Sequence, residues 1–203
     1  MTPERKHLFD EVLLNVAEQI GTMSVATRAK VGAILYKNKN IISMGWNGLP
    51  SGMPNDLIES REGDKLITNP RVRHAEDNVF DKLIYDGNHS GAAGATLYQS
   101  YSPCPRCADR IIASGVARIV FRNFYRDQSA LPWIIDAGIS LEQLSSDAEY
   151  PTIITREMLS IPPSPPEPPP NRILCNACGP LVNGKHTSFI CRMLQQLDKA
   201  LKE

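Results

Sequence analysis

The sequence predicts a layered α/β domain, with helices on both faces of one sheet, followed by a linker and a small tail. Two observations predict this fold class. Segments with apolar residues at every third or fourth position alternate with short runs rich in β-branched and aromatic residues. Hydrophobic residues make up 42% of the chain and charged residues 22%, as in folded globular proteins.

The first predicted elements are a helix and a hairpin. Thr2 caps the helix and Pro3 lies in its first turn. The predicted buried face of this helix consists of apolar residues at helical spacing: Leu8, Val12, Val16, Ile20 and Met23. Strands at 31–36 and 41–46 flank a turn whose asparagines tolerate the backbone that a tight hairpin needs, so we expect antiparallel pairing.

The rest of the domain continues this alternation. The stretch 48–70 is rich in Gly, Pro and Asn and is predicted to be a long excursion. The elements expected after it are a helix at 74–85, a strand at 96–98, a helix at 104–114, a strand at 116–121 and a helix at 132–137.

Composition changes sharply near residue 160. The segment 161–170 reads IPPSPPEPPP and holds 7 of the chain's 16 prolines. Consecutive prolines fix φ and remove backbone donors, so this segment is predicted to be a semi-rigid linker. It is either a surface strap or a ligand for a polyproline-binding partner, and no aromatic or basic flank specifies such a partner. The predicted organisation is a domain at 1–160, a linker at 161–170 and a tail at 171–203.

Charge and hydropathy exclude several classes of function. The 22 basic residues balance the 22 acidic ones, so the chain lacks the positive field of a protein that binds duplex DNA or RNA, and we expect no polynucleotide partner. No apolar run approaches the roughly 18 to 20 residues of a membrane span, and no signal-peptide core follows residue 6, so we expect a cytoplasmic protein with no membrane partner. In a reducing compartment, Cys-x2-Cys pairs indicate metal or redox chemistry.

The residues that indicate chemistry stand at the starts of two predicted helices. Cys104 and Cys107 share one side of a helical turn, where the positive end of the helix dipole favours metal-binding thiolates. With His74 they make three ligands, which leaves the fourth position of tetrahedral zinc for water. Glu76 lies too near His74 to be a ligand on the same face, so we expect it to take a proton from that water and deliver it to a substrate nitrogen. The pattern predicts a hydrolytic zinc site.

Two other interpretations explain less of this pattern. A redox pair needs a thioredoxin-like strand before the cysteines and gives no role to His74 or Glu76. A structural zinc site needs a fourth protein ligand, and only three are supplied here.

The order H-x-E followed by P-C-x2-C is the signature of zinc-dependent nucleobase deaminases, and both halves occur in this chain. The likeness extends beyond the metal site, over roughly residues 5–145. The segments that carry it are 31–35 (VGAIL), 45–52 (GWNGLPSG), 74–78 (HAEDN) and 102–108 (SPCPRCA). In these segments the chain resembles the deoxycytidylate deaminases of the cytidine and deoxycytidylate deaminase superfamily. Asp77 departs from the pattern, because apolar residues are more usual at that position.

The resemblance implies a cytidine-deaminase-like α/β/α fold with a five-stranded mixed sheet and the two metal-bearing helix starts side by side. It also implies hydrolysis of dCMP to dUMP and ammonia, which supplies dUMP for thymidylate synthesis. In that reaction His74, Cys104 and Cys107 hold zinc, and the activated water attacks C4 of the pyrimidine. Glu76 protonates N3 and the leaving amine.

The resemblance implies substrate contacts as well. Asn47 would contact the sugar, and Tyr125 would pack on or bond the nucleotide. The backbone of Ala75 and Ser102 would read the pyrimidine edge. Arg28 is the candidate for the 5′-phosphate, because a guanidinium fork fits phosphate oxygens. A turn-forming role for Asn47 and a solvated helix end for Arg28 stay open.

Regulation and assembly follow from the same likeness. It implies a homo-oligomer, commonly a hexamer, with dCTP as activator and dTTP as inhibitor near the loop after Gly48. Acidic residues of that loop could hold Mg2+ beside a triphosphate: Asp56, Glu59, Glu62 and Asp64.

Alternative substrates stay open: CMP, dCTP and 5-modified dCMP. The tRNA adenosine deaminases fit less well, because their interval corresponding to 49–73 is much shorter and a polynucleotide needs more cationic residues. Deamination of a free base also stays open, but such an enzyme would have no need for the long interval at 49–73.

The tail raises a separate question. Its potential ligands have a spacing compatible with Cys3His zinc: Cys175, Cys178, His186 and Cys191. Residues 188–201 form an amphipathic helical pattern, but a segment of 33 residues builds little core alone, so we predict a zinc knuckle with a second, structural zinc. A docked helix with ordinary thiols is the alternative. A zinc module that binds nucleic acid or protein is the second candidate for the main function, and it leaves His74 and Glu76 without a role.

Overall fold

The computed structural model describes residues 2–85, 87, 91–148, 150–159, 174–175 and 179–180. The chain divides into two compact units, Met1–Ile161 and Pro162–Glu203. In the second unit the described residues form two short paired strands, β9 (Leu174–Cys175) and β10 (Gly179–Pro180). The predicted linker and the predicted tail helix lie outside the described residues.

The first unit alternates helices and strands along the chain. Its helices are α1 (Pro3–Gly21), α2 (Ala75–Tyr85), α3 (Pro105–Ala113) and α4 (Leu131–Asp136). Its strands are β1 (Gly32–Lys37), β2 (Asn40–Trp46), β3 (Glu59–Glu62), β4 (Lys65–Thr68), β5 (Thr96–Tyr101), β6 (Arg118–Asn123), β7 (Ser140–Gln143) and β8 (Thr152–Ile153). Short 3₁₀ helices lie at Asn55–Leu57 and Glu157–Leu159.

The main sheet is mixed and has the strand order β2-β1-β5-β6-β7-β8. β5, β6 and β7 are parallel, whereas β1 pairs antiparallel with β2 and β5, and β8 pairs antiparallel with β7. The sequence analysis predicted five strands and the sheet has six, because the two-residue strand β8 adds to the outer edge of β7. The predicted α/β class and mixed sheet are confirmed.

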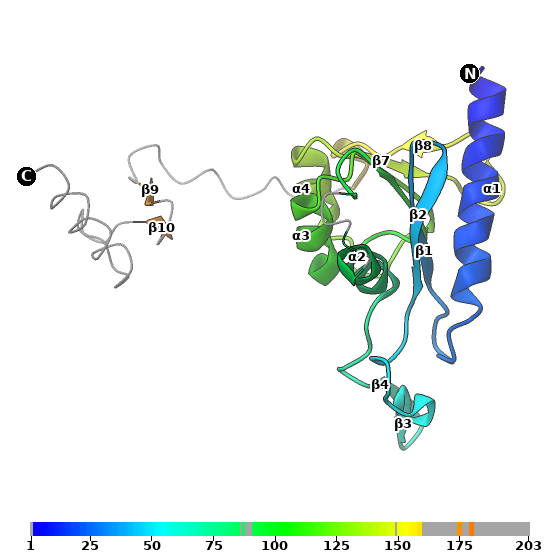
Figure 1. The fold of residues 1–203 in the computed structure, drawn as a ribbon, viewed down its shortest axis with the longest axis vertical. Coiled ribbons are helices and arrows are strands. Elements are labelled where there is room, and N and C mark those ends of the chain that lie inside the picture. Colours follow the sequence, from blue (N-terminus) through cyan, green and yellow to red (C-terminus); the bar gives the residue numbers. More distant parts are fainter. Residues whose placement is uncertain are drawn as a thin grey trace, which may run out of the picture. The chain divides into compact units, whose positions relative to one another are not determined.

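Helices cover both faces of this sheet. As Figure 1 shows, α1 lies on one face and α2, α3 and α4 lie on the other. Alternate residues of β6 point to opposite layers: Ile119 and Phe121 join the large apolar cluster under α2–α4, and Val120 packs with Leu14 of α1. Among the described residues, no helix is both long enough and apolar enough to cross a membrane.

The predicted hairpin is formed by β1 and β2. Lys37 faces Asn40 across a two-residue turn. Both turn residues have positive φ, 51° at Asn38 and 64° at Lys39, which is the backbone of the tight turn that matches the twist of the two strands.

The predicted buried face of α1 is correct only for Val16 and Ile20, which pack on the apolar cluster of this layer. Leu8, Val12 and Met23 are 62%, 52% and 60% exposed. The residues buried against the sheet are instead Asp10, Leu13, Leu14, Ala17 and Gly21. The helix approaches the sheet through its small residues, since a Cβ at Gly32 would lie 1.9 Å from the Ala17 carbonyl oxygen.

Charges also set the orientation of α1. Arg118 of β6 donates two hydrogen bonds of 2.7 Å to Asp10 and further ones to Glu142 of β7. The Tyr98 hydroxyl donates to Asp10 at 2.7 Å. The partners of Arg122, on the same face of β6, include three residues of α1: Glu11, Asn15 and Glu18. Since buried charges are costly without partners, rotating α1 to bury its apolar stripe would break these pairs.

The stretch after β2 is an ordered excursion that contains the hairpin β3–β4, which the sequence analysis did not predict. Its strands are short and mostly polar, so they give little apolar alternation. A small apolar cluster anchors the excursion to the segment after α1: Ala26, Ile58 and Val72, with Leu49.

Candidate zinc site

The site lies where two helices begin on the same face of the sheet. His74 directly precedes α2, and its carbonyl accepts from the Asn78 amide at 3.2 Å. Cys104 is the N-cap of α3, and its carbonyl accepts from the Cys107 and Ala108 amides at 3.0 Å each. The Cys104 thiol makes no capping hydrogen bond, so it is available as a ligand.

Three donor atoms meet between these helix starts, as the sequence analysis predicted. His74 Nδ1 lies 3.3 Å from the Sγ atoms of Cys104 and Cys107, and the two Sγ atoms lie 3.5 Å apart. In tetrahedral zinc with metal–ligand bonds of about 2.0 to 2.3 Å, ligand atoms lie roughly 3.5 to 3.8 Å from one another. The three residues therefore fit zinc, and the described part of the chain supplies no fourth ligand to this cluster.

The three donors differ in how firmly they hold a proton. Hydrogen bonds with Cys107 and His74 lower the pKa of Cys104 to about 4. The contact with Cys104, together with burial, raises the pKa of Cys107. The hydrogen bond with Cys104 raises the pKa of His74. A thiolate thus lies beside donors that still hold protons, and a metal that binds all three displaces those protons.

Glu76 occupies the first turn of α2 and is 6% exposed. Burial raises the pKa of its carboxyl to about 7. A carboxyl group that titrates near neutral pH can both accept and return a proton, as general acid–base catalysis requires.

Asn47 lies on a segment that borders this site, whereas Arg28 lies between α1 and β1 and contacts the β3–β4 hairpin. Backbone hydrogen bonds between Gly48 and Arg73, at 2.8 and 3.1 Å, bring Asn47 next to the chain that enters His74. The Asn47 side chain accepts from the Val31 amide at 2.8 Å and donates to the Ala29 carbonyl at 2.9 Å. Arg28 is exposed and donates to Thr68 at 3.2 Å.

Ala75, Ser102 and Tyr125 lie near the helix starts. Ala75 begins α2 and is fully buried. The Ser102 amide donates to the Asn123 carbonyl at 2.8 Å, and its hydroxyl accepts from the Tyr125 amide at 2.9 Å. These contacts hold the segment after β6 beside the segment that leads into Cys104, while Tyr125 packs on the apolar core.

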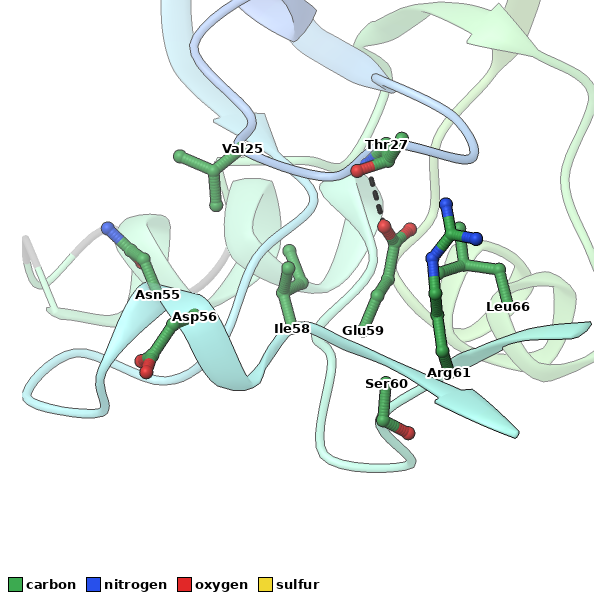
Figure 2. Close-up of a pocket in the computed structure, with 9 residues that line it drawn as sticks. All are labelled: Val25, Thr27, Asn55, Asp56, Ile58, Glu59, Ser60, Arg61 and Leu66. Atoms are coloured by element: carbon green, nitrogen blue, oxygen red, sulfur yellow. Dashed lines mark hydrogen bonds between the residues drawn. The ribbon is translucent and has the colours of Figure 1, made fainter. Parts of the chain in front are cut away.

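A cavity of about 450 Å3 lies against the β3–β4 hairpin (Figure 2). Of the four acidic residues predicted to hold Mg2+, Asp56 and Glu59 line it. Glu62 and Asp64 are not among its lining residues. Glu59 accepts from the amides of Thr27 at 2.8 Å and Arg28 at 3.0 Å. Burial disfavours the charged form of Glu59, but the amides of Thr27 and Arg28 favour it more strongly and lower the pKa of this carboxyl.

One group of residues near the site was missed by the sequence analysis. Asp77 accepts from Arg106 at 3.0 Å and from Arg110 at 3.2 Å, so it joins α2 to α3. Arg110 also donates to Asp81 at 2.5 Å, and Arg73 pairs with the same carboxylate. The available signal was the departure from the family pattern at Asp77, together with two arginines spaced one turn apart on the next helix.

The predicted tail ligands belong to the second unit of the chain. Cys178, His186 and Cys191 lie outside the described residues. Cys175 belongs to β9, whose backbone alone is described.

Comparison with known proteins agrees with this site. Residues 7–123 match the family model for the cytidine and deoxycytidylate deaminase zinc-binding region. Deoxycytidylate deaminase of Saccharomyces cerevisiae is 26% identical over 160 residues, which are 76% of this chain and 50% of that protein. Deoxycytidylate deaminase of Mycobacterium phage D29 is 32% identical over 123 residues, which are 56% of this chain and 93% of that one.

A solved structure extends the likeness to three dimensions. The crystal structure of dCMP deaminase from the cyanophage S-TIM5, in complex with dCMP and dUMP, is 35% identical with a TM-score of 0.59. The match covers 71% of this chain and 99% of that one. The shared fold, the His-Cys-Cys cluster and the match over more than half of the sequence lead to one conclusion: this chain belongs to the zinc-binding cytidine and deoxycytidylate deaminase family.

Proposed function

We propose that this chain hydrolyses dCMP to dUMP and ammonia, with zinc held by His74, Cys104 and Cys107. The observation that carries the proposal is the approach of these three donors to within 4.8 Å of one another, next to the buried carboxyl of Glu76. The 35% identity with the cyanophage dCMP deaminase supports the choice of nucleotide. The product would supply dUMP for thymidylate synthesis.

The reaction needs one group that moves protons, and Glu76 is suited to it. Bound zinc supplies a Lewis acid that makes water nucleophilic at neutral pH. Glu76 takes a proton from the water whose oxygen adds to C4 of the ring, and gives that proton to N3. Glu76 then transfers the second proton of this water to the exocyclic amine, which leaves as ammonia while C4 keeps the oxygen as a carbonyl.

The substrate contacts are proposed from the family resemblance. Asn47 keeps hydrogen-bonding capacity for a sugar hydroxyl, because its oxygen has a second lone pair and its amide a second hydrogen. Arg28 is exposed, and its guanidinium would reach a 5′-phosphate by giving up its hydrogen bond to Thr68. Tyr125 would contact the nucleotide, and the backbone of Ala75 and Ser102 would read the pyrimidine edge.

One assay tests the substrate. Ammonia release is measured from dCMP, CMP, deoxycytidine, dCTP, cytosine and a 5-substituted dCMP at equal concentration. We expect dCMP to be preferred, and Arg28→Gln to raise KM for dCMP while leaving turnover of deoxycytidine unchanged. A preference for an unphosphorylated substrate would reject the proposal. A preference for CMP, dCTP or the 5-substituted nucleotide would reassign it to another cytosine nucleotide.

Regulation and assembly complete the proposal. We expect dCTP to activate and dTTP to inhibit through the excursion at 49–73, with Mg2+ accompanying the triphosphate. Hyperbolic dCMP kinetics that neither triphosphate alters would count against this regulation. We also expect a homo-oligomer, with a hexamer favoured, and the exposed apolar residues Leu8, Val12 and Met23 support association. Light scattering after size exclusion gives the mass directly.

For the tail we propose a second, structural zinc at Cys175, Cys178, His186 and Cys191. Four protein ligands would close the coordination sphere, so this metal would contribute folding energy and no chemistry. Elemental analysis should find two zinc ions per chain, falling to one in Cys178→Ser with partial turnover retained. One zinc in the unmodified protein, held by Cys104 and Cys107, would show that the tail thiols are ordinary. We also expect the protein to work in the reducing cytoplasm, where cysteines stay available as metal ligands.

The second candidate function assigns the main role to the tail as a zinc module for nucleic acid or protein. It leaves the cluster of His74, Cys104 and Cys107 unexplained. Turnover that survives removal of 161–203 would support the proposed division into a domain at 1–160, a linker at 161–170 and a tail at 171–203.

A further inference from the structure

The carboxylate of Asp77 is bound from both helices that carry the zinc ligands. Its Oδ2 accepts from the backbone amide of His74 at 3.3 Å and from Arg106 at 3.0 Å. Its Oδ1 accepts from Arg110 at 3.2 Å. The side chain is only 10% exposed, so these three donors face a carboxylate that water reaches poorly.

These contacts involve the ligand segments themselves. The His74 amide belongs to a ligand residue, and Arg106 lies between Cys104 and Cys107 in the sequence. Asp77 therefore joins the backbone of one ligand to the turn that carries the other two. Any movement of α3 relative to α2 must stretch these hydrogen bonds.

Asp81, one turn further along α2, provides an internal comparison. It accepts from Arg110 at 2.5 Å and pairs with Arg73, so it too connects α2 to α3. Its side chain is 45% exposed, and the structure gives it no hydrogen bond to the His74 backbone or to Arg106. The two aspartates thus share the ion pairing between helices, and Asp77 differs by its direct contacts with the ligand segments.

We propose that Asp77 is a positioning residue for zinc: it holds His74 in register with Cys104 and Cys107 before the metal binds. Groups behind metal ligands fix ligand orientation, and their loss typically weakens metal binding about 10- to 100-fold. This inference rests on the zinc site of the proposed function. It assigns a role to the residue at which the chain departs from the family pattern.

The test compares Asp77→Asn with Asp81→Asn in the full-length protein. Zinc affinity is measured by competition with a chromophoric chelator, and the melting temperature is measured after metal removal. We expect Asp77→Asn to weaken zinc binding about 10- to 100-fold and Asp81→Asn to change it less than about threefold. The melting temperature of metal-free Asp77→Asn should fall further than that of Asp81→Asn, because Asp77 is less exposed and has three donors, so zinc affinity is the measurement that decides.

A second pair of variants covers the case in which Asp77→Asn does not fold. Arg106 is half-exposed, and Arg106→Gln removes the α3 side of the contact while leaving the His74 amide bound. We expect Arg106→Gln to weaken zinc binding and Arg106→Lys to restore most of it. The visible absorption of the Co2+-substituted proteins should change in Asp77→Asn or Arg106→Gln and match the parent in Asp81→Asn, because it reports ligand geometry.

Two results would overturn the inference while leaving the zinc site intact. One is parental zinc affinity in Asp77→Asn, or in Arg106→Gln where the first variant is unfolded. The other is an equal loss of affinity in Asp81→Asn, which would show that general helix pairing is responsible. A parent protein that binds no zinc at His74, Cys104 and Cys107 would overturn the proposed function together with this inference.

Discussion

The two faces of the main sheet are held to their helices by different forces. Under α2–α4 the layer is a large apolar cluster that includes Leu97, Ile119 and Phe121. Under α1 the apolar cluster is smaller, and Arg118 and Arg122 tie the helix to the sheet through buried hydrogen-bonded charges. The first face also carries the cluster of His74, Cys104 and Cys107 at its helix starts, so it should respond to metal. The second face depends on charge, so it should respond to pH and to the loss of a charged partner. The following changes test this contrast.

The largest effect is expected on the site face, from Glu76→Gln, which removes the carboxyl group proposed to move protons. Turnover of dCMP should fall by at least about 10²- to 10⁴-fold, because the amide cannot accept or return a proton. Zinc content and melting temperature should stay near the parent values. An active variant would reject the assigned role, and loss of zinc would make Glu76 a ligand or a structural residue.

On the α1 face, Arg118→Ala should destabilise the protein by about 3 to 5 kcal/mol, because it leaves Asp10 and Glu142 buried without their cation. Chemical denaturation gives the free energy of unfolding. Arg71→Ala is the matched control, since Arg71 is exposed, and it should change that energy by less than about 0.5 kcal/mol. A loss no larger than the control's would contradict the charge-based account of this face.

Acid should weaken the α1 face by a smaller amount. Burial opposes the charge of Glu142, but its hydrogen bond and charge interaction with Arg118 outweigh this and lower its pKa. The folded state therefore gains stability from this carboxylate above the ordinary glutamate pKa of about 4.3 and loses that gain as pH falls through the lower, folded value. Urea midpoints from pH 7 to pH 3 should show a shallower decline in Glu142→Gln than in the parent. Parallel curves would exclude Glu142 as the source.

The smallest expected effect lies on the site face and has the opposite sign. Gln99 is fully buried, and neither its amide nitrogen nor its oxygen has a partner among the described residues. Gln99→Leu should stabilise the fold by about 1 kcal/mol, because it removes unpaired polar atoms at similar volume. Gln143→Leu is the control, since the Gln143 amide donates to the Arg122 carbonyl at 3.2 Å and should bring no gain. Destabilisation by Gln99→Leu would show that the amide has a partner after all.

Local patterns made the cluster of His74, Cys104 and Cys107 and much of the fold predictable. Each ligand stands at a helix start, so the spacing of Cys104 and Cys107 was enough to predict that their thiols share one side of α3. The asparagine-rich turn likewise predicted the β1–β2 hairpin from neighbouring residues alone.

The features that sequence reasoning missed depend on distant partners. Apolar spacing placed Leu8, Val12 and Met23 on the buried face of α1, where the structure exposes them, because Arg118 lies 108 positions from Asp10 and no local pattern reveals that pair. Asp77 shows the same difficulty, since Arg106 is 29 positions away. Strand β8, with two residues, is too short to give a periodic signal.

The arrangement of Arg118 and Arg122 has a consequence for the surface of the molecule. Arg118 binds Asp10, whereas Arg122 binds Glu11, and consecutive helical residues point about 100° apart around the axis. Arg118 and Arg122 of β6 thus restrict the rotation of α1 about its own axis. These charge pairs act together with the burial of Leu14 and Ala17, and in the resulting orientation Val12 faces outward. The side chains of β6 that contact one side of α1 therefore influence which residues α1 exposes on its opposite side.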